Sequence, residues 1–177
     1  MKTNIVIVGF LRGFNEEVCK KLADQLNMFY ADISDLVAYE LSNQDEMITI
    51  CGQDYYDEQE KKTIQNTSTF ENTIFNFNYD YFYNHKNYKS FKKTSHIIYL
   101  KIDPKKLDRK IKSDNDALTW ATAIDVIDYA DRDKFLMENA DFVAYSERLS
   151  SNLYIKEIKN YLLNLYSEEV WIYIKNQ

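Results

Sequence analysis

A strand–loop–helix pattern at the start of the chain constrains the fold more than any other feature. The four apolar residues Ile5–Val8 predict a buried strand, and apolar residues recur at helical spacing from Glu16 to Leu26. The loop that starts at Gly9 reads Gly-Phe-Leu-Arg-Gly-Phe-Asn-Glu, in the setting of the phosphate-binding pattern G-x-x-x-x-G-K-[ST]. This setting predicts the scaffold of a nucleotide-binding domain.

The loop lacks the side chains that hold a phosphate in this pattern. Phe14 stands at the second glycine, Asn15 at the lysine and Glu16 at the serine or threonine. Taking Gly13 as the second glycine places Phe14 and Asn15 at the lysine and the hydroxyl residue, so the shift restores neither group. Because these groups are missing, the loop predicts no ordinary phosphate binding. Arg12 is the nearby cation that is able to reach a phosphate.

The start of the following helix carries acidic residues. We predict that Asn15 is its N-cap and that Glu16 and Glu17 place carboxylates in the first turn. These carboxylates would satisfy the positive end of the helix with the protein's own charge and repel a triphosphate from the usual anion site. The simpler interpretation is a well-capped helix start, which also leaves no ordinary phosphate loop.

Short strands alternate with helical patterns along the rest of the chain. We expect strands near residues 28–31, 97–102 and 142–144 and at least at the start of residues 74–83. We expect helices near residues 32–41, 54–65, 86–93, 104–111, 117–129, 132–139 and 155–165. Such alternation implies a parallel sheet, here five-stranded, with helices on both faces. We see no linker, and we expect a single α/β domain over residues 1–166 and a C-terminal extension over residues 167–177.

Composition excludes several classes of function. The net charge of −6 and the pI of about 5.0 argue against nucleic acid or an anionic membrane as a partner. The first apolar run is too short for a signal peptide or a membrane span. Cys19 and Cys51 are isolated, which favours a reduced, cytoplasmic protein. His85 and His96 lack ligand-type spacing, and we expect no metal site.

The C-terminal extension differs in character from the rest of the chain. Residues 170–174 are five consecutive apolar residues, Val-Trp-Ile-Tyr-Ile. They form an added edge strand, a helix extension or a segment that binds a partner. We favour packing on the chain's own domain, with a homodimer through the extension as the other possibility.

Four segments, in their order and spacing, resemble the shikimate kinase family of P-loop small-molecule kinases. They are the opening strand and loop at 5–10, L-N-M-F-Y-A-D at 26–32, Y-L-K-I-D-P-K-K-L at 99–107 and R-D-K-F-L-M-E-N-A-D at 132–141. The resemblance spans about residues 4–165 and implies a three-layer P-loop kinase-like fold. In the family, the loop cradles the phosphates of ATP and its Ser/Thr ligates Mg²⁺.

The chain departs from the family's patterns on the substrate side as well. The Asp-x-Asp after the second strand becomes D-I-S at 32–34, and the F-R-x-x-E pattern becomes Y-D-E-Q-E at 56–60. Asp57 thus stands at an arginine that pairs with a substrate carboxylate. The Gly-Gly-Gly segment becomes Phe-Asn-Tyr around Asn78, and the lid segment at 116–119 lacks its arginine.

Asp32 and Arg132 are what is left of the expected substrate-binding set, alongside Asp57 and Asn78 in the same cleft. Asp32 either binds a ligand or only caps the end of a strand. Arg132 either binds a ligand or is held by Asp128 or another nearby acid. If the chain is active, Asp32 is the base or a metal ligand.

The combined losses predict a catalytically inactive protein that binds no ATP, needs no cofactor and has a binding, regulatory or scaffold role toward an unidentified protein or small molecule. The alternative is a kinase that uses ATP and Mg²⁺ with an atypical loop, in which Arg12 is the phosphate clamp, and that phosphorylates a substrate other than shikimate. A third hypothesis is a small-molecule sensor lined by Phe77, Tyr79 and Tyr81. These aromatic residues alternatively only fill the cleft.

Overall fold

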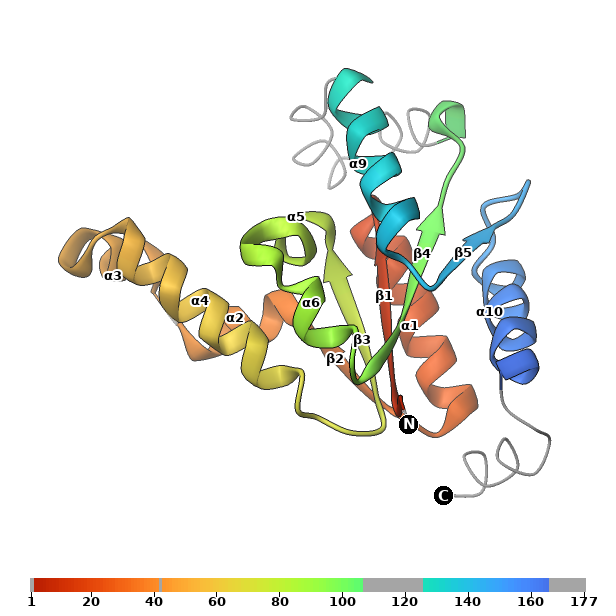
Figure 1. The fold of residues 1–177 in the computed structure, drawn as a ribbon, viewed down its shortest axis with the longest axis horizontal. Helices are drawn as coiled ribbons and strands as arrows, with labels where there is room; N and C mark the ends of the chain where they lie inside the picture. Colours follow the sequence, from red (N-terminus) through yellow and green to blue (C-terminus); the bar gives the residue numbers. More distant parts are fainter. Residues whose placement is uncertain (1, 42, 107–125, 166–177) are drawn as a thin grey trace.

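Five parallel strands form one sheet in the order β2-β3-β1-β4-β5 (Figure 1). The computed structural model describes residues 2–41, 43–106 and 126–165. The strands are β1 (Asn4–Gly9), β2 (Phe29–Asp32), β3 (Thr73–Asn78), β4 (Ser95–Lys101) and β5 (Phe142–Tyr145). Every neighbouring pair is parallel, which confirms the predicted sheet.

Helices cover both faces of this sheet, as predicted. One face packs on α1 (Arg12–Leu26) and α10 (Ser151–Leu165). The other face packs on α2 (Ile33–Glu40), α4 (Gln53–Thr67), α5 (Tyr79–Tyr83), α6 (Tyr88–Phe91) and α9 (Val126–Asn139). Two short elements, α3 (Gln44–Cys51) and the 3₁₀ turn η1 (Asn84–Lys86), complete the described part of the chain.

The central strand β1 joins the two hydrophobic layers. Val6 and Val8 face the layer with α2 and α9, whereas Ile5 and Ile7 face the layer with α1 and α10. All four side chains are buried because successive residues of a strand point to opposite faces. A strand covered on both faces reads as a continuous apolar run, which is why this one was recognisable in the sequence.

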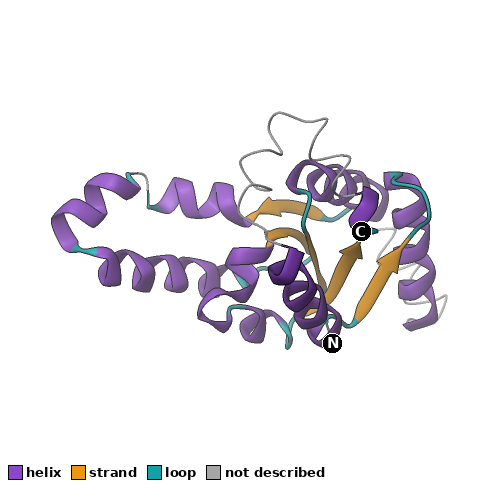
Figure 2. Cartoon of the chain, turned by 90° about the horizontal axis from the view of Figure 1, so that it is seen from above, coloured by secondary structure: helices purple, strands orange, loops and turns teal. Residues whose placement is uncertain are grey.

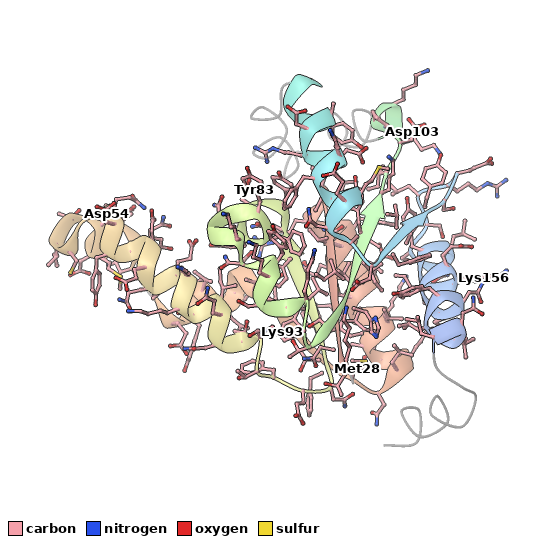
Figure 3. All side chains as sticks on the ribbon, viewed as in Figure 1. Met28, Asp54, Tyr83, Lys93, Asp103 and Lys156 are labelled. Carbon is pink, nitrogen blue, oxygen red and sulfur yellow. The ribbon has the colours of Figure 1, made fainter. Side chains whose placement is uncertain are left out.

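The carboxyl ends of the strands lie together at one edge of the sheet. Gly9 is in register with Asn78 on one side and with Leu100 on the other, and Asp32 is in register with Asn76. Figure 3 shows Tyr83 and Asp103 beyond this upper edge and Met28 and Lys93 at the opposite edge. Open α/β sheets bind ligands at the carboxyl ends of their strands, so this edge is where a functional site is expected.

The helices α3 and α4 form an arm that projects from the sheet (Figures 1 and 2). Asp54 lies at the outer end of the arm (Figure 3). α3 has no buried residue, and the sequence did not predict it. α4 follows the predicted helix at 54–65 and buries one stripe of residues, Tyr56, Glu60, Ile64 and Thr67.

Two predicted helix boundaries are wrong. α1 begins at Arg12 rather than near Glu16. α9 is continuous from Val126 to Asn139, where the sequence predicted a break between two helices. Asp133, just after the predicted break, binds Tyr99 and Lys101 on β4. The predicted end of the first helix at Asn27 is confirmed by its left-handed φ of 53°.

Several predictions concern residues outside the described ranges. They are residues 107–111 of the helix at 104–111, the first part of the helix at 117–129, the lid segment at 116–119, and the extension at 167–177 with its homodimer contact. Within the described residues, no helix is both long and apolar enough to cross a membrane.

Candidate functional site

The connection from β1 to α1 has only two residues, Phe10 and Leu11. Both are buried, and Leu11 is extended at φ −109° and ψ 98°. The backbone N–H of Asn15 donates to the Leu11 carbonyl at 2.8 Å, as in a helix. In the phosphate-binding pattern four residues separate the two glycines. Here the last two of these, Arg12 and Gly13, already belong to α1.

Phe10 fixes this connection against the aromatic layer of the core. Its ring centroid lies 4.9 Å from that of Tyr129, 5.8 Å from Tyr79 and 6.0 Å from Tyr99. Aromatic pairs at such separations are favourable beyond the area that they bury. The first residue after the strand is therefore held inward by packing, and the chain turns directly into the helix.

The prediction that Asn15 caps α1 is wrong. Leu11 occupies the N-cap position and makes no side-chain cap bond, and the first turn of α1 contains no acidic residue. Glu16 and Glu17 lie further along the helix, where their carboxylates bind Lys20 at 2.6 Å and Lys21 at 2.7 Å. The predicted placement of these two carboxylates in the first turn of the helix is therefore wrong as well.

The Asn15 side chain instead packs directly against Gly9. A Cβ atom at Gly9 would lie 2.7 Å from Asn15 Oδ1 and 3.2 Å from the Leu100 carbonyl oxygen. Both polar atoms of the Asn15 side chain are buried, and neither has a hydrogen-bond partner among the described residues. Gly9 is thus required for the close approach of strand and helix, whatever its relation to a phosphate.

Asp32 at the end of β2 is the N-cap of α2. Its Oδ1 accepts hydrogen bonds from the backbone N–H groups of Ser34 at 2.8 Å and Asp35 at 3.2 Å. Its Oδ2 accepts from Asn76 Nδ2 at 2.6 Å and from the Tyr30 hydroxyl at 3.4 Å. The capping interpretation of Asp32 is confirmed, and both oxygens of this buried carboxylate are occupied.

Arg12 connects the start of α1 with the start of α2. Its Nη2 lies 3.2 Å from Asp35 Oδ1 and 3.9 Å from Asp32 Oδ1. The Arg12 side chain is 44% exposed, so solvent screens these ion pairs.

Arg132 on α9 is held by an acid other than Asp128, whose side chain lies outside the described set. Its Nη1 binds Asp80 Oδ1 on α5 at 3.1 Å, and its guanidinium lies 4.6 Å from the centre of the Tyr79 ring. The side chain is 22% exposed. The expectation that a nearby acid holds Arg132 is therefore confirmed.

Asn78 at the end of β3 caps α5. Its Oδ1 accepts from the backbone N–H of Tyr81 at 2.8 Å, and its Nδ2 donates to Ser34 Oγ at 3.5 Å. The segment that aligns with the family's three glycines is thus the start of a helix, and the Asn78 side chain caps it.

Asp57 lies on α4, where its Oδ1 accepts from Gln53 Nε2 at 2.7 Å. Three residues further along, Glu60 is only 9% exposed. Burial, and secondarily the charge of Asp57, raise the pKa of Glu60 to about 7. Glu60 was not predicted as a site residue, although it stands at the glutamate of the F-R-x-x-E pattern. The signal that identifies it is its place in the buried stripe of α4, four residues after Tyr56 and four before Ile64.

Tyr81 at the start of α5 links these groups electrostatically. Burial raises the pKa of its hydroxyl to about 12, with added contributions from Glu60, Tyr56 and Asp32 and an opposing one from Arg12. Arg12, Asp32 and Glu60 therefore all act electrostatically on the Tyr81 hydroxyl, and Glu60 was not among the predicted site residues.

Comparisons with known proteins agree with this architecture. The family model for shikimate kinase matches residues 17–163, so the match begins just after the segment 9–16. Comparison with curated proteins finds no match.

Solved shikimate kinases share the fold at low sequence identity. The enzyme from Aquifex aeolicus has a TM-score of 0.71 and 18% identity, over 92% of this chain and 98% of its own. The enzyme from Acinetobacter baumannii, solved with shikimate, has a TM-score of 0.73 and 13% identity, over 95% and 97%. The enzyme from Bacteroides thetaiotaomicron has a TM-score of 0.66 and 15% identity, over 90% and 98%. Because the family model matches most of its length, the chain belongs to the shikimate kinase family.

Proposed function

We propose that this member of the shikimate kinase family is catalytically inactive, does not bind ATP in the ordinary way and has a binding, regulatory or scaffold role without a cofactor. The observation that carries the proposal is the two-residue connection between β1 and α1. A phosphate-binding loop holds a phosphate by wrapping several backbone N–H groups around it. Phe10 and Leu11 are buried, and the next residues are helical, which leaves little backbone for such a wrap.

The side chains near this connection support the proposal. Asn15 stands at the lysine of the pattern and is buried beneath Gly9. Lys20 and Lys21 bind Glu16 and Glu17 on their own helix. A kinase of this fold contributes mainly positioning and charge stabilisation of the transferred phosphoryl group, and these residues supply neither in the usual place.

The substrate side supports the proposal as well. Both oxygens of Asp32 accept internal hydrogen bonds, which disfavours a role as base. Arg132 binds Asp80 and stacks on Tyr79. Asp57 replaces the arginine expected to pair with a substrate carboxylate, and shikimate carries such a group. A cytoplasmic location and an unidentified protein or small-molecule partner belong to the same proposal.

Calorimetry with Mg-ATP tests the proposal. We expect a dissociation constant weaker than about 100 μM and no transfer of phosphate to shikimate in a coupled assay. A thermal-shift measurement on the same sample gives a second readout, since a ligand of the native state raises the apparent stability. Binding of Mg-ATP tighter than about 100 μM would contradict the proposal.

The exposure of Arg12 favours one alternative, a kinase with an atypical phosphate clamp. Arg12 is the first residue of α1, is 44% exposed and points across the carboxyl end of the sheet toward Asp35. In such an enzyme Arg12→Ala abolishes turnover of ATP. Lys20→Ala, which removes an exposed cation further along α1, is the matched control and leaves turnover intact.

A further inference from the structure

Glu60 is a buried residue whose carboxyl group has no counter-charge among the described residues. It is 9% exposed and makes no hydrogen bond or ion pair with another residue in the described part of the chain. Asp32, which is similarly buried, accepts four hydrogen bonds. An ionised carboxylate in such a position costs free energy unless a partner compensates it. Glu60 therefore lacks the compensation that the same fold gives to Asp32.

The surroundings of Glu60 are aromatic and acidic. Tyr56 precedes it by one helical turn in the buried stripe of α4 and is 4% exposed. The Tyr81 hydroxyl, from α5, lies within reach of the charge on Glu60. Asp57 adds a second carboxylate on the same helix. We call Tyr56, Asp57, Glu60 and Tyr81 the Glu60 cluster.

Two described cations near the Glu60 cluster have partners of their own, and Lys61, the next residue on α4, is exposed. Arg12 pairs with Asp35 and lies close enough to lower the pKa of Tyr81. Lys62 on α4 binds Glu58 on the exposed side of the helix. In the F-R-x-x-E pattern an arginine stands three residues before the glutamate, and residues three apart on a helix are neighbours. Here that position is Asp57, so the chain offers Glu60 an acid in place of a cation.

We propose that the Glu60 cluster binds a small organic cation, a protonated amine or a quaternary ammonium group, whose positive charge takes the place of the missing counter-charge. The inference rests on the binding role proposed above and names the class of molecule bound. The cation pairs with the Glu60 carboxylate, and Tyr56, one helical turn earlier in the same buried stripe, supplies an aromatic ring of the kind that stabilises organic cations. The added carboxylate of Asp57 favours a cation and disfavours an acid such as shikimate.

Calorimetry with benzylammonium and tetramethylammonium chloride tests the inference, with sodium benzoate as the anionic counterpart. At about pH 8 the Glu60 carboxyl is mostly ionised. We expect at least one of the two cations to bind with a dissociation constant in the millimolar range or below, and benzoate to show no binding.

Two variants on α4 separate this site from general acidity of the protein. Glu60→Gln keeps the shape of the side chain and removes its charge, and we expect the cation to bind at least about tenfold more weakly. Glu58→Gln removes an exposed charge two residues away, and we expect its affinity to match the wild type. Circular dichroism verifies that both variants are folded.

The inference is overturned if neither cation binds the wild type up to about 10 mM, or if Glu60→Gln binds as tightly as the wild type. The same samples are titrated with Mg-ATP. Binding of Mg-ATP contradicts the proposed inactivity and leaves the cation result standing. If neither the cations nor Mg-ATP bind, the inference about the cation is overturned and the proposed inactivity stands.

Discussion

At Gly9 the end of β1 and the second turn of α1 come too close together for a side chain. The nearest atoms belong to the Asn15 side chain and to the Leu100 backbone. Gly9 is also the first glycine of the phosphate-binding pattern, which makes it easy to interpret as a trace of ATP binding. Packing between Gly9 and Asn15 is a sufficient reason for this glycine, because only glycine fits there.

Substitution of Gly9 measures this packing. We expect Gly9→Ala to lower the free energy of unfolding by about 1–3 kcal/mol, since the new methyl group overlaps Asn15 Oδ1. The matched control is Gly13→Ala, at a helical position where an added methyl group would meet no heavy atom within 4 Å. We expect this control to raise stability by up to about 1 kcal/mol through helix propensity. Urea denaturation measures both changes.

The double variant Gly9→Ala/Asn15→Ala identifies the cause. We expect it to recover part of the loss, because the contact with Asn15 disappears while the 3.2 Å contact with the Leu100 carbonyl oxygen persists. Equal stability of Gly9→Ala and the wild type would show that the strand and helix are not closely packed at this point.

Single residues also show where the sequence analysis failed. Asn15 followed by two acids is a strong local signal for a helix start, yet α1 begins at Arg12, in a stretch without any cap residue. The burial of Phe10 and Leu11 determines that boundary, and burial depends on tertiary packing. The burial of Glu60 was not predicted for a related reason. Acidic residues are mostly exposed, and only the neighbours of Glu60 in space show that it is buried.

At the scale of elements, an ion pair adds to the ring contacts that Phe135 of α9 makes with α5. Arg132 on α9 binds Asp80 on α5, and the guanidinium stacks on Tyr79 in the same helix. Tyr79 in turn stacks on Phe10 of the β1–α1 connection at 5.8 Å. Arg132 therefore links two helices to the residue that fixes the start of α1.

We expect Arg132→Ala to lower the free energy of unfolding by about 1–2 kcal/mol, because it removes both the ion pair and the cation–π contact. A double-mutant cycle with Asp80→Ala isolates the ion pair, for which we expect a coupling energy of about 0.5–1 kcal/mol. Lys134→Ala, at an exposed position of α9, is the control and changes stability by less than about 0.5 kcal/mol. A coupling energy near zero would contradict the assigned pairing.

Elements were predictable where burial creates a regular apolar pattern. β1 and β4 are apolar runs covered on both faces, and α10 buries residues at helical spacing, so the sequence located all three. α3 buries no residue, and it therefore carries no complete apolar stripe to recognise. The charged side chains of α9 bind neighbouring elements, and no sequence pattern reveals these contacts.

At the scale of the whole molecule, fold and chemistry vary independently. The order β2-β3-β1-β4-β5 and the two helical layers follow from the alternation of strands and helices, and the family model matches residues 17–163. The β1–α1 connection and the Glu60 cluster are local changes on this scaffold. A function assigned from the fold alone would overlook both, because function resides in sites and not in the architecture that holds them.

The Glu60 carboxyl also affects how the stability of the whole molecule depends on pH. Its pKa is about 7 in the folded chain, against an ordinary value of 4.5. Below the ordinary value the group is protonated in both states and contributes nothing. Between the two values the unfolded chain binds fewer protons, so stability falls as the pH rises, and above about pH 7 the whole penalty is present.

We expect Glu60→Gln, which cannot ionise, to be more stable than the wild type at pH 8 by about 1–2 kcal/mol and to lose this advantage near pH 4.5. Urea denaturation at intervals across this range measures the difference. Burial lowers the pKa of His96, which makes stability rise with pH, but His96 is present in both proteins and cancels in the difference. A difference that is constant with pH would mean that Glu60 already has a compensating partner in the free protein, which would also remove the basis for a bound cation.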